Sequence, residues 1–203
     1  MIMNVLIACE FSGIVRDAFR ARGHEAWSCD LLPCEGDQAW HYEGDVLSFL
    51  YFADWDLMIA HPPCTYLALC QAWRCNRDPE RAKLREDAVA FATALWNAPI
   101  PRIAIENPKS QLSTMMAPKS QTIHPWQYGH REMKETWLWL KGLPQLKPTN
   151  IVGPPPSKES PERKDWERIW RMPPGPDRAK ARSRTYQGVA EAMAEQWGQT
   201  NEL

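Results

Sequence analysis

Short apolar runs that each end in polar turn residues constrain the fold of this 203-residue chain more than any other feature. Residues 4–8, 57–60 and 102–105 are too short for a helix and are almost wholly apolar, which is typical of strands buried on both faces. Residues 25–28 predict a further strand, and residues 14–22 and 80–96 show the apolar spacing of helices. Because strands alternate with helices, we expect an α/β fold with a mostly parallel sheet and helices on both faces.

Polar clusters follow these strands at residues 9–13, at Asp30, at residues 61–64 and at residues 106–108. The carboxyl ends of parallel strands meet at one edge of a sheet, and ligands bind at that edge. We therefore expect the four clusters to form one site.

The first clusters fit a nucleotide-like cofactor. Glycine in the Glu10-Phe11-Ser12-Gly13 turn would let a ligand approach the backbone, although many strand-to-helix turns contain glycine. Asp30 could accept hydrogen bonds from both ribose hydroxyls, and Asp45 after Gly44 is a similar candidate. Either aspartate could equally be an exposed turn residue.

The later clusters fit covalent and acid–base chemistry. Pro62 and Pro63 fix an extended turn that holds the following Cys64 thiol in one direction, as a nucleophile requires. Cysteine is also common as a small buried apolar residue. Glu106 follows an apolar run, so its pKa is expected to be raised and the residue to act as a proton donor; a capping or ion-paired glutamate is the alternative.

The second half of the chain is less regular. Residues 134–140 predict a late strand and residues 188–197 a helix, while residues 144–161 and 173–176 are proline-rich. We expect one domain over residues 1–203, with a short irregular insertion at about 144–184. A basic run within it could be a nucleic-acid-binding face or a solvated loop; its members are Arg178, Lys180, Arg182 and Arg184.

The sequence favours a cytoplasmic protein without a membrane anchor or a metal. No apolar stretch approaches the ~20 residues that span a bilayer, and the apolar start lacks the basic residues of a signal peptide. The six cysteines form no CxxC pair, so neither a disulfide framework nor a zinc site is expected.

In their order and spacing the clusters resemble the cytosine-C5 DNA methyltransferases. That family has a Phe-Ser/Ala-Gly turn, an acidic residue after the second strand, a Gly-Asp pair, a Pro-Cys nucleophile and a Glu-Asn pair. The matching residues here are Phe11 to Gly13, Asp30, Gly44-Asp45, Pro63-Cys64 and Glu106-Asn107. Residues 126–144 and 183–190 look most like small phage-encoded members, whose DNA would be protected from restriction by the modification.

The resemblance implies a Rossmann-like class I methyltransferase fold, S-adenosylmethionine as cofactor and DNA as partner, in the host cytoplasm if the chain is phage-encoded. Cys64 would add to C6 of cytosine, Glu106 would serve N3, and Arg131 or Lys134 would hold the carbonyl at C2. Glu10 to Gly13, Asp30, Asp45 and Pro62 would line the cofactor site. The insertion would stand in place of a full target-recognition domain.

Other functions stay open at this point. The short recognition region also suits single-stranded DNA, RNA or a free pyrimidine nucleotide as substrate. A catalytically silent nucleic-acid-binding protein with the same fold is disfavoured by the presence of both Cys64 and Glu106. An adenine-N6 or cytosine-N4 methyltransferase is disfavoured because residues 61–64 lack the amine-accepting Asp, Asn or Ser that begins its motif and the aromatic residue that ends it.

Overall fold

The computed structural model describes residues 1–199, which form a seven-stranded sheet in the order β3-β2-β1-β4-β5-β7-β6. Neighbouring strands from β3 to β5 are parallel, whereas β7 is antiparallel to both β5 and β6. The strands are β1 (Asn4–Ala8), β2 (Glu25–Asp30), β3 (His41–Glu43), β4 (Leu57–Ala60), β5 (Arg102–Pro108), β6 (Gln121–Ile123) and β7 (Thr136–Lys141). This order, with one reversed strand, is that of the Rossmann-like class I methyltransferase fold, so the expected fold class is confirmed.

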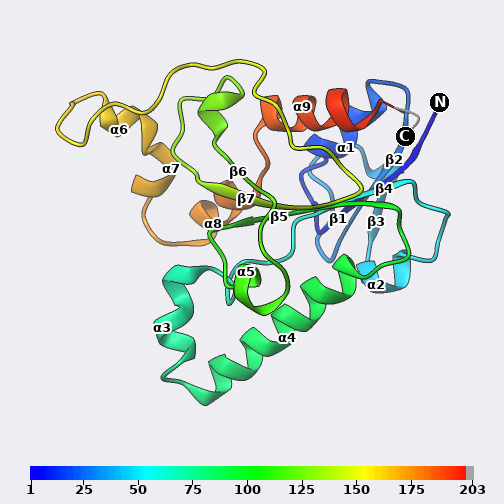
Figure 1. Cartoon of the computed structure of the whole chain (residues 1–203), viewed down its shortest axis with the longest axis horizontal. Helices are drawn as coiled ribbons and strands as arrows, with labels where there is room; N and C mark the ends of the chain where they lie inside the picture. Colours follow the sequence, from blue (N-terminus) through cyan, green and yellow to red (C-terminus); the bar gives the residue numbers. More distant parts are fainter. Residues whose placement is uncertain (200–203) are drawn as a thin grey trace.

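Helices cover both faces of the sheet, as expected (Figure 1). On one face lie α1 (Ile14–Arg20) and α9 (Gln187–Trp197), whose buried Phe19 and Trp197 pack on alternate residues of β1 and β4. On the other face lie α2 (Val46–Phe49), α5 (Leu112–Met115) and the carboxyl-terminal part of α4 (Pro79–Trp96). Successive strand residues point to opposite faces, so the fully apolar runs of β1 and β4 supply both layers of core.

The amino-terminal half of α4 extends beyond the sheet. Only Ala92 and Leu95 of this helix are fully buried, and Leu84 is exposed although the sequence pattern placed it on the apolar face. Before α4 come a 3₁₀ turn, η2 (Leu69–Gln71), and the short α3 (Ala72–Cys75), which packs against α4.

The proline-rich insertion is more regular than expected. Residues 144–161 are irregular, but the rest contains α6 (Arg163–Trp166), α7 (Arg168–Arg171) and α8 (Pro176–Ser183). Proline at the start of α8 suits a first helical turn, where no backbone donor is needed. Two further 3₁₀ turns are η1 (Gln38–Trp40) and η3 (Pro125–Gln127). Within residues 1–199, no helix combines the length and apolar character needed to cross a bilayer.

Candidate active site

Strand register brings the polar clusters to one edge of the sheet. Ala8 pairs with Ala60, and Ala60 pairs with Ile105, so the residues that follow each of them lie at the same level. Ala8 also pairs with Cys29, which places Asp30 at this level on the other side of β1. The convergence predicted from the sequence is therefore present.

Glu106 lies at the centre of a buried charged group. Its Oε2 is 3.0 Å from Nδ1 of His61, and its Oε1 is 3.8 Å from Nζ of Lys134. The Glu106 side chain is only 12% exposed, so these two partners are poorly screened by water.

The expectation that Glu106 has a raised pKa is wrong. Burial does act in that direction, but the Lys134 ammonium and the hydrogen bond with His61 outweigh it and hold the pKa of Glu106 at about 2. The residue is therefore a carboxylate at neutral pH, and the proton at the contact with His61 lies on Nδ1.

Cys64 lies close to the Glu106 carboxylate. It is the fourth residue after β4, in the turn that begins at His61. Burial raises the pKa of the Cys64 thiol, and the negative charge of Glu106 raises it further, against the opposing effects of Lys134 and Arg182. The side chain is half-buried rather than enclosed. The resting group is a neutral thiol, and its side chain is partly exposed to solvent.

Asn107 fixes the turn that carries Cys64. Its buried side-chain amide donates to the carbonyl oxygen of Pro62 over 2.8 Å, which ties β5 to the segment after β4. The following residues turn tightly, because the amides of Leu67 and Ala68 both donate to the carbonyl of Cys64. Pro62, a predicted cofactor residue, thus uses its carbonyl within the protein.

The turn after β1 is shaped by Glu10. This carboxylate is buried and accepts hydrogen bonds from the amides of Val15 and Arg16 and from the hydroxyl of Ser12. Burial raises the pKa of Glu10, although these bonds and His61 oppose the shift. Glu10 therefore holds the turn in place, and direct contact with a cofactor stays a prediction.

Gly13 is required by this turn on two grounds. Its φ of 74° lies in the left-handed region, and a Cβ atom there would come within 2.6 Å of Nη2 of Arg16. The buried Arg16 guanidinium also donates to Ser28 and to the carbonyl of Asp37, so it joins the turn to β2 and to the loop beyond it. Phe11 is bound to that loop too, since its carbonyl accepts from the amide of Glu35.

Asp30 and Asp45 lie together beside Cys9, whose thiol pKa is raised by burial first and then by these two carboxylates. Oδ1 of each aspartate accepts a backbone amide, from Leu32 and Leu47 respectively. Leu32 is more than half exposed next to Asp30. The structure therefore places Asp30 at the end of β2 and Asp45 after β3, on one side of β1. On the other side lie Cys64 and the predicted cofactor residue Pro62, which follow β4, and Glu106, which is part of β5.

Arg131 and Lys134 were equal candidates for the supporting cation, and the structure separates them. Lys134 reaches Glu106 and also donates to the carbonyl of Arg182 over 3.1 Å. Arg131 is exposed and has no hydrogen bond or ion pair within residues 1–199.

Two further residues belong to the site without having been assigned a role from the sequence. His61 contacts Glu106 directly. The register of β4 and β5 explains this contact, because Ala60 pairs with Ile105 and the two residues follow them. Tyr186 lines a cavity of about 10 Å³ with Glu106, Lys134 and Thr136, room for about one water molecule. Tyr186 falls within residues 183–190, which carry part of the resemblance, but its place beside Lys134 could not be predicted because the two are 52 positions apart.

Helix α8 and Arg184, the residue that follows it, contact both the loop after β2 and the predicted catalytic residue Lys134. Lys180 and Arg184 both bind Glu35 on the cofactor side, at 2.5 and 2.7 Å, while the carbonyl of Arg182 contacts Lys134 on the catalytic side. We call the contacts of Glu35 with Lys180 and Arg184 the Glu35 clasp. Figure 1 shows α8 against one end of the sheet, after α7.

Of the comparisons with known proteins, only the one with solved structures found similar proteins. No family model matches the sequence, and no curated protein is significantly similar to it. Among solved structures, the S. pombe Dnmt2 methyltransferase aligns with 15% identity and a TM-score of 0.47, covering 71% of this chain and 51% of its own. The Entamoeba histolytica methyltransferase EhMeth aligns with 14% identity and a TM-score of 0.48, covering 75% of this chain and 58% of its own. The chain thus spans little more than half the length of either protein.

Proposed function

We propose that this protein transfers a methyl group from S-adenosylmethionine to C5 of cytosine in DNA, with Cys64 as the nucleophile. The observation that carries the proposal is the placement of the Cys64 thiol close enough to the Glu106 carboxylate for its charge to raise the thiol pKa, on a turn that Asn107 ties to β5 at the carboxyl edge of the sheet. A decoy without activity has no physical need for this arrangement.

The end of β2 and the residues after it include groups that fit S-adenosylmethionine. Asp30 keeps Oδ2 free of hydrogen bonds within residues 1–199, and an exposed leucine lies beside it. A carboxylate suits ribose hydroxyls, and an apolar side chain suits the face of adenine. When bound, S-adenosylmethionine would supply an electrophilic methyl group.

Cys64 would make the pyrimidine ring reactive. Cytosine C5 is a weak nucleophile, and addition of the Cys64 thiolate to C6 converts it into an enamine carbon. After C5 carries the methyl group, loss of its proton restores the double bond as the sulfur–C6 bond breaks. Because the thiol is neutral at rest, its proton must pass to a base as the sulfur attacks, and the neighbouring Glu106 carboxylate can accept it.

Glu106 would change its protonation when the ring binds. At rest Lys134 is the main group that holds it as a carboxylate, while burial favours the neutral acid. If Lys134 turns to the carbonyl oxygen at C2 of the ring, burial raises the pKa of Glu106. The carboxyl can then carry a proton and share it with N3, which stabilises the charge of the adduct.

RNA or a pyrimidine nucleotide is the second candidate substrate, because residues 144–184 comprise an irregular stretch and three short helices rather than a separate recognition domain. The test is transfer of a radiolabelled methyl group to duplex DNA, single-stranded DNA, RNA and cytosine nucleotides. Wild-type protein should label cytosine in DNA, and Cys64→Ser should reduce the rate at least 1,000-fold while cofactor affinity stays within twofold. Cys70→Ser, which changes an exposed cysteine, is the matched control. Substantial turnover by Cys64→Ser would contradict covalent catalysis, and labelling of RNA alone would change the substrate.

A further inference from the structure

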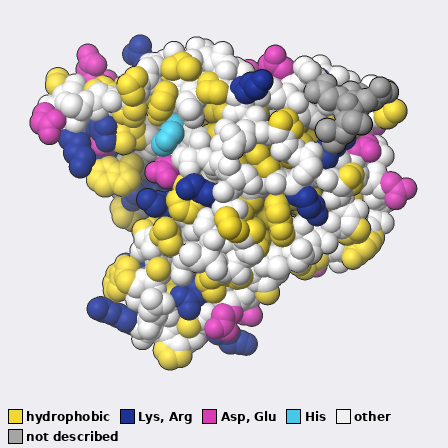
Figure 2. All heavy atoms as spheres, in the orientation of Figure 1, with side chains coloured by type: hydrophobic (Ala, Val, Ile, Leu, Met, Phe, Trp, Pro, Cys, Tyr) yellow, Lys and Arg dark blue, Asp and Glu magenta, His cyan; other side chains and the backbone are white. Residues whose placement is uncertain are grey.

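The segment directly after the Cys64 turn projects from the molecule. Residues 69–85 comprise η2, α3 and the start of α4, and we call them the arginine–tryptophan lobe. Figure 2 shows this region as a protrusion at the bottom of the view, with Lys or Arg side chains and hydrophobic side chains on its surface. Its base is tied to the site, because the amide of Leu69 donates to the carbonyl of Lys109 just beyond β5.

Trp73 is the most exposed large ring of the lobe. It is 54% exposed, and the guanidinium carbons of Arg74 and Arg77 lie 5.2 and 5.5 Å from its ring centroid. These distances are within the range of cation–π attraction, which keeps two cations beside the exposed ring. A tryptophan has a large apolar area, so leaving it in water is unfavourable unless a partner covers it.

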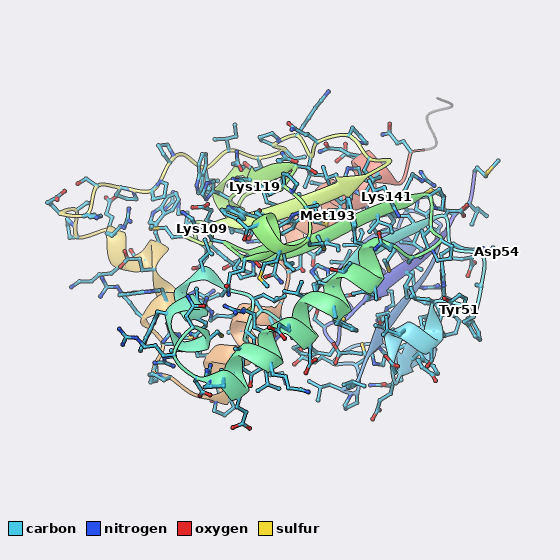
Figure 3. The ribbon with its side chains drawn as sticks, turned by 60° about the horizontal axis from the view of Figure 1, so that its bottom comes forward. Tyr51, Asp54, Lys109, Lys119, Lys141 and Met193 are labelled. Carbon is cyan, nitrogen blue, oxygen red and sulfur yellow. The ribbon has the colours of Figure 1, made fainter. Side chains whose placement is uncertain are left out.

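The lobe also carries an excess of positive charge. Its charged residues are Arg74, Arg77, Asp78, Glu80, Arg81, Lys83 and Arg85, five basic against two acidic. None of the five cations forms an ion pair with a carboxylate among residues 1–199. The Asp78 carboxylate accepts the amides of Glu80 and Arg81 at the start of α4 instead. Lys109, labelled in Figure 3, adds an exposed cation near the base of the lobe that forms no ion pair with residues 1–199.

The basic run at residues 178–184 differs in this respect. Lys180 and Arg184, two of its four members, are neutralised by Glu35 in the clasp. Trp170 on α7 is even more exposed than Trp73, at 61%, but its neighbour Arg171 is paired with Glu167. Free cations beside an exposed ring are thus a feature of the lobe and not of the insertion.

We propose that the arginine–tryptophan lobe binds an unpaired nucleic-acid strand, with a base stacked on Trp73 and phosphates held by Arg74 and Arg77. An aromatic face with flanking cations suits the base and the backbone of a single strand together, whereas paired bases in a duplex do not offer a free face. The inference rests on the proposed function, since it concerns how the strand next to the target cytosine is held.

The test is fluorescence anisotropy of wild-type protein with labelled twelve-nucleotide single-stranded DNA, single-stranded RNA and duplex DNA. Trp73→Ala should weaken single-strand binding about 5- to 160-fold, as expected for one lost stack. Trp73→Phe should restore most of it. Trp170→Ala, the matched control, should change affinity less than twofold. The double variant Arg74→Gln/Arg77→Gln should reduce the slope of log Kd against log salt by about 1.4, from two lost phosphate contacts.

The outcomes separate this inference from the proposed function. Equal affinities of Trp73→Ala and Trp170→Ala, or binding of duplex alone, would overturn the role of the lobe. Methylation of free nucleotides by a protein that binds no strand would also overturn it and leave methyl transfer intact. Binding that depends on Trp73 in a protein that methylates nothing would support the lobe and refute the enzyme. Circular dichroism of each variant shows whether it is folded.

Discussion

At the scale of single residues, the site depends on opposing influences on one carboxyl group. Glu106 is buried enough for its neutral form to be favoured, yet Lys134 and His61 keep it ionised. A group balanced in this way responds strongly to the loss or movement of one partner. The same carboxylate raises the pKa of the Cys64 thiol, so protonation of Glu106 would also make that thiol easier to ionise.

The variant Lys134→Met should raise the pKa of Glu106 well above about 2, because it removes the main cation that opposes burial. An NMR titration of the glutamate carboxyl carbons would measure the change. Lys119→Met is the control, since this exposed lysine lies over Trp137, 4.1 Å from its ring centroid, and is labelled in Figure 3. An unchanged Glu106 pKa in Lys134→Met would show that His61 alone maintains the carboxylate.

At the scale of elements, α8 and Arg184 directly after it connect Glu35 with the predicted catalytic residue Lys134. Glu35 and Arg184 are 149 positions apart, so no local pattern could have predicted the clasp. The basic run was recognisable in the sequence, but its interpretation depended on which acidic residue it would meet. The buried strands, unlike the clasp, could be predicted from the sequence, because an apolar run such as residues 57–60 identifies a strand by its local composition. The three-residue β3 and β6 were not predicted, since their pairing depends on strands elsewhere in the chain.

Glu35→Gln should release α8 from the cofactor side. The hydrogen bonds of Arg184 and Lys180 hold the pKa of Glu35 at about 2, so the clasp is complete above about pH 4.5 and is lost as the pH falls toward 2. Exposed ion pairs contribute at most about 1 kcal/mol, so global stability should hardly change. Trypsin should cut within residues 178–184 several-fold faster in the variant at neutral pH.

High salt should accelerate the same cleavage in the wild-type protein, because it screens the pair. Glu25→Gln removes a longer surface contact, 3.9 Å from Arg20, and should leave cleavage unchanged. If Glu35→Gln is cut no faster than Glu25→Gln, α8 is held by packing rather than by the clasp.

At the scale of the whole molecule, one sheet edge receives residues from both halves of the chain. Residues 4–108 supply the parallel strands and most of the site, and this part was largely predictable because each strand end carries its own polar cluster. The rest of the site comes from the second half of the chain and includes Lys134, Tyr186 and α8. Lys134 shortly precedes β7 and Tyr186 directly precedes α9, so the packing of these two elements brings both residues to the same edge. Their assembly depends on packing between distant segments. For this reason the sequence could not decide whether Arg131 or Lys134 is the supporting cation.

Binding of the methyl donor should stabilise the folded protein, because its expected site is an edge of the sheet that the unfolded chain lacks. At 100 times its Kd, a single-site ligand adds about 2.7 kcal/mol. For a domain of this size, that corresponds to a rise in Tm of about 5–10 °C. Differential scanning calorimetry with S-adenosylmethionine would measure it. Asp30→Ala should lose much of the rise, because this carboxylate lies at the carboxyl end of β2 with one oxygen free.

Asp54→Ala is the matched control for that measurement. Asp54 is exposed and precedes β4 at the amino edge of the sheet, and it is labelled in Figure 3. Its variant should keep the full rise in Tm. An equal rise in Asp30→Ala would remove Asp30 from the cofactor site, while no rise in the wild-type protein would refute the methyl donor itself. Asp30 lies at the carboxyl edge of the sheet and Asp54 at the amino edge. A different rise in Tm for the two variants would therefore show that the ligand binds at the carboxyl edge.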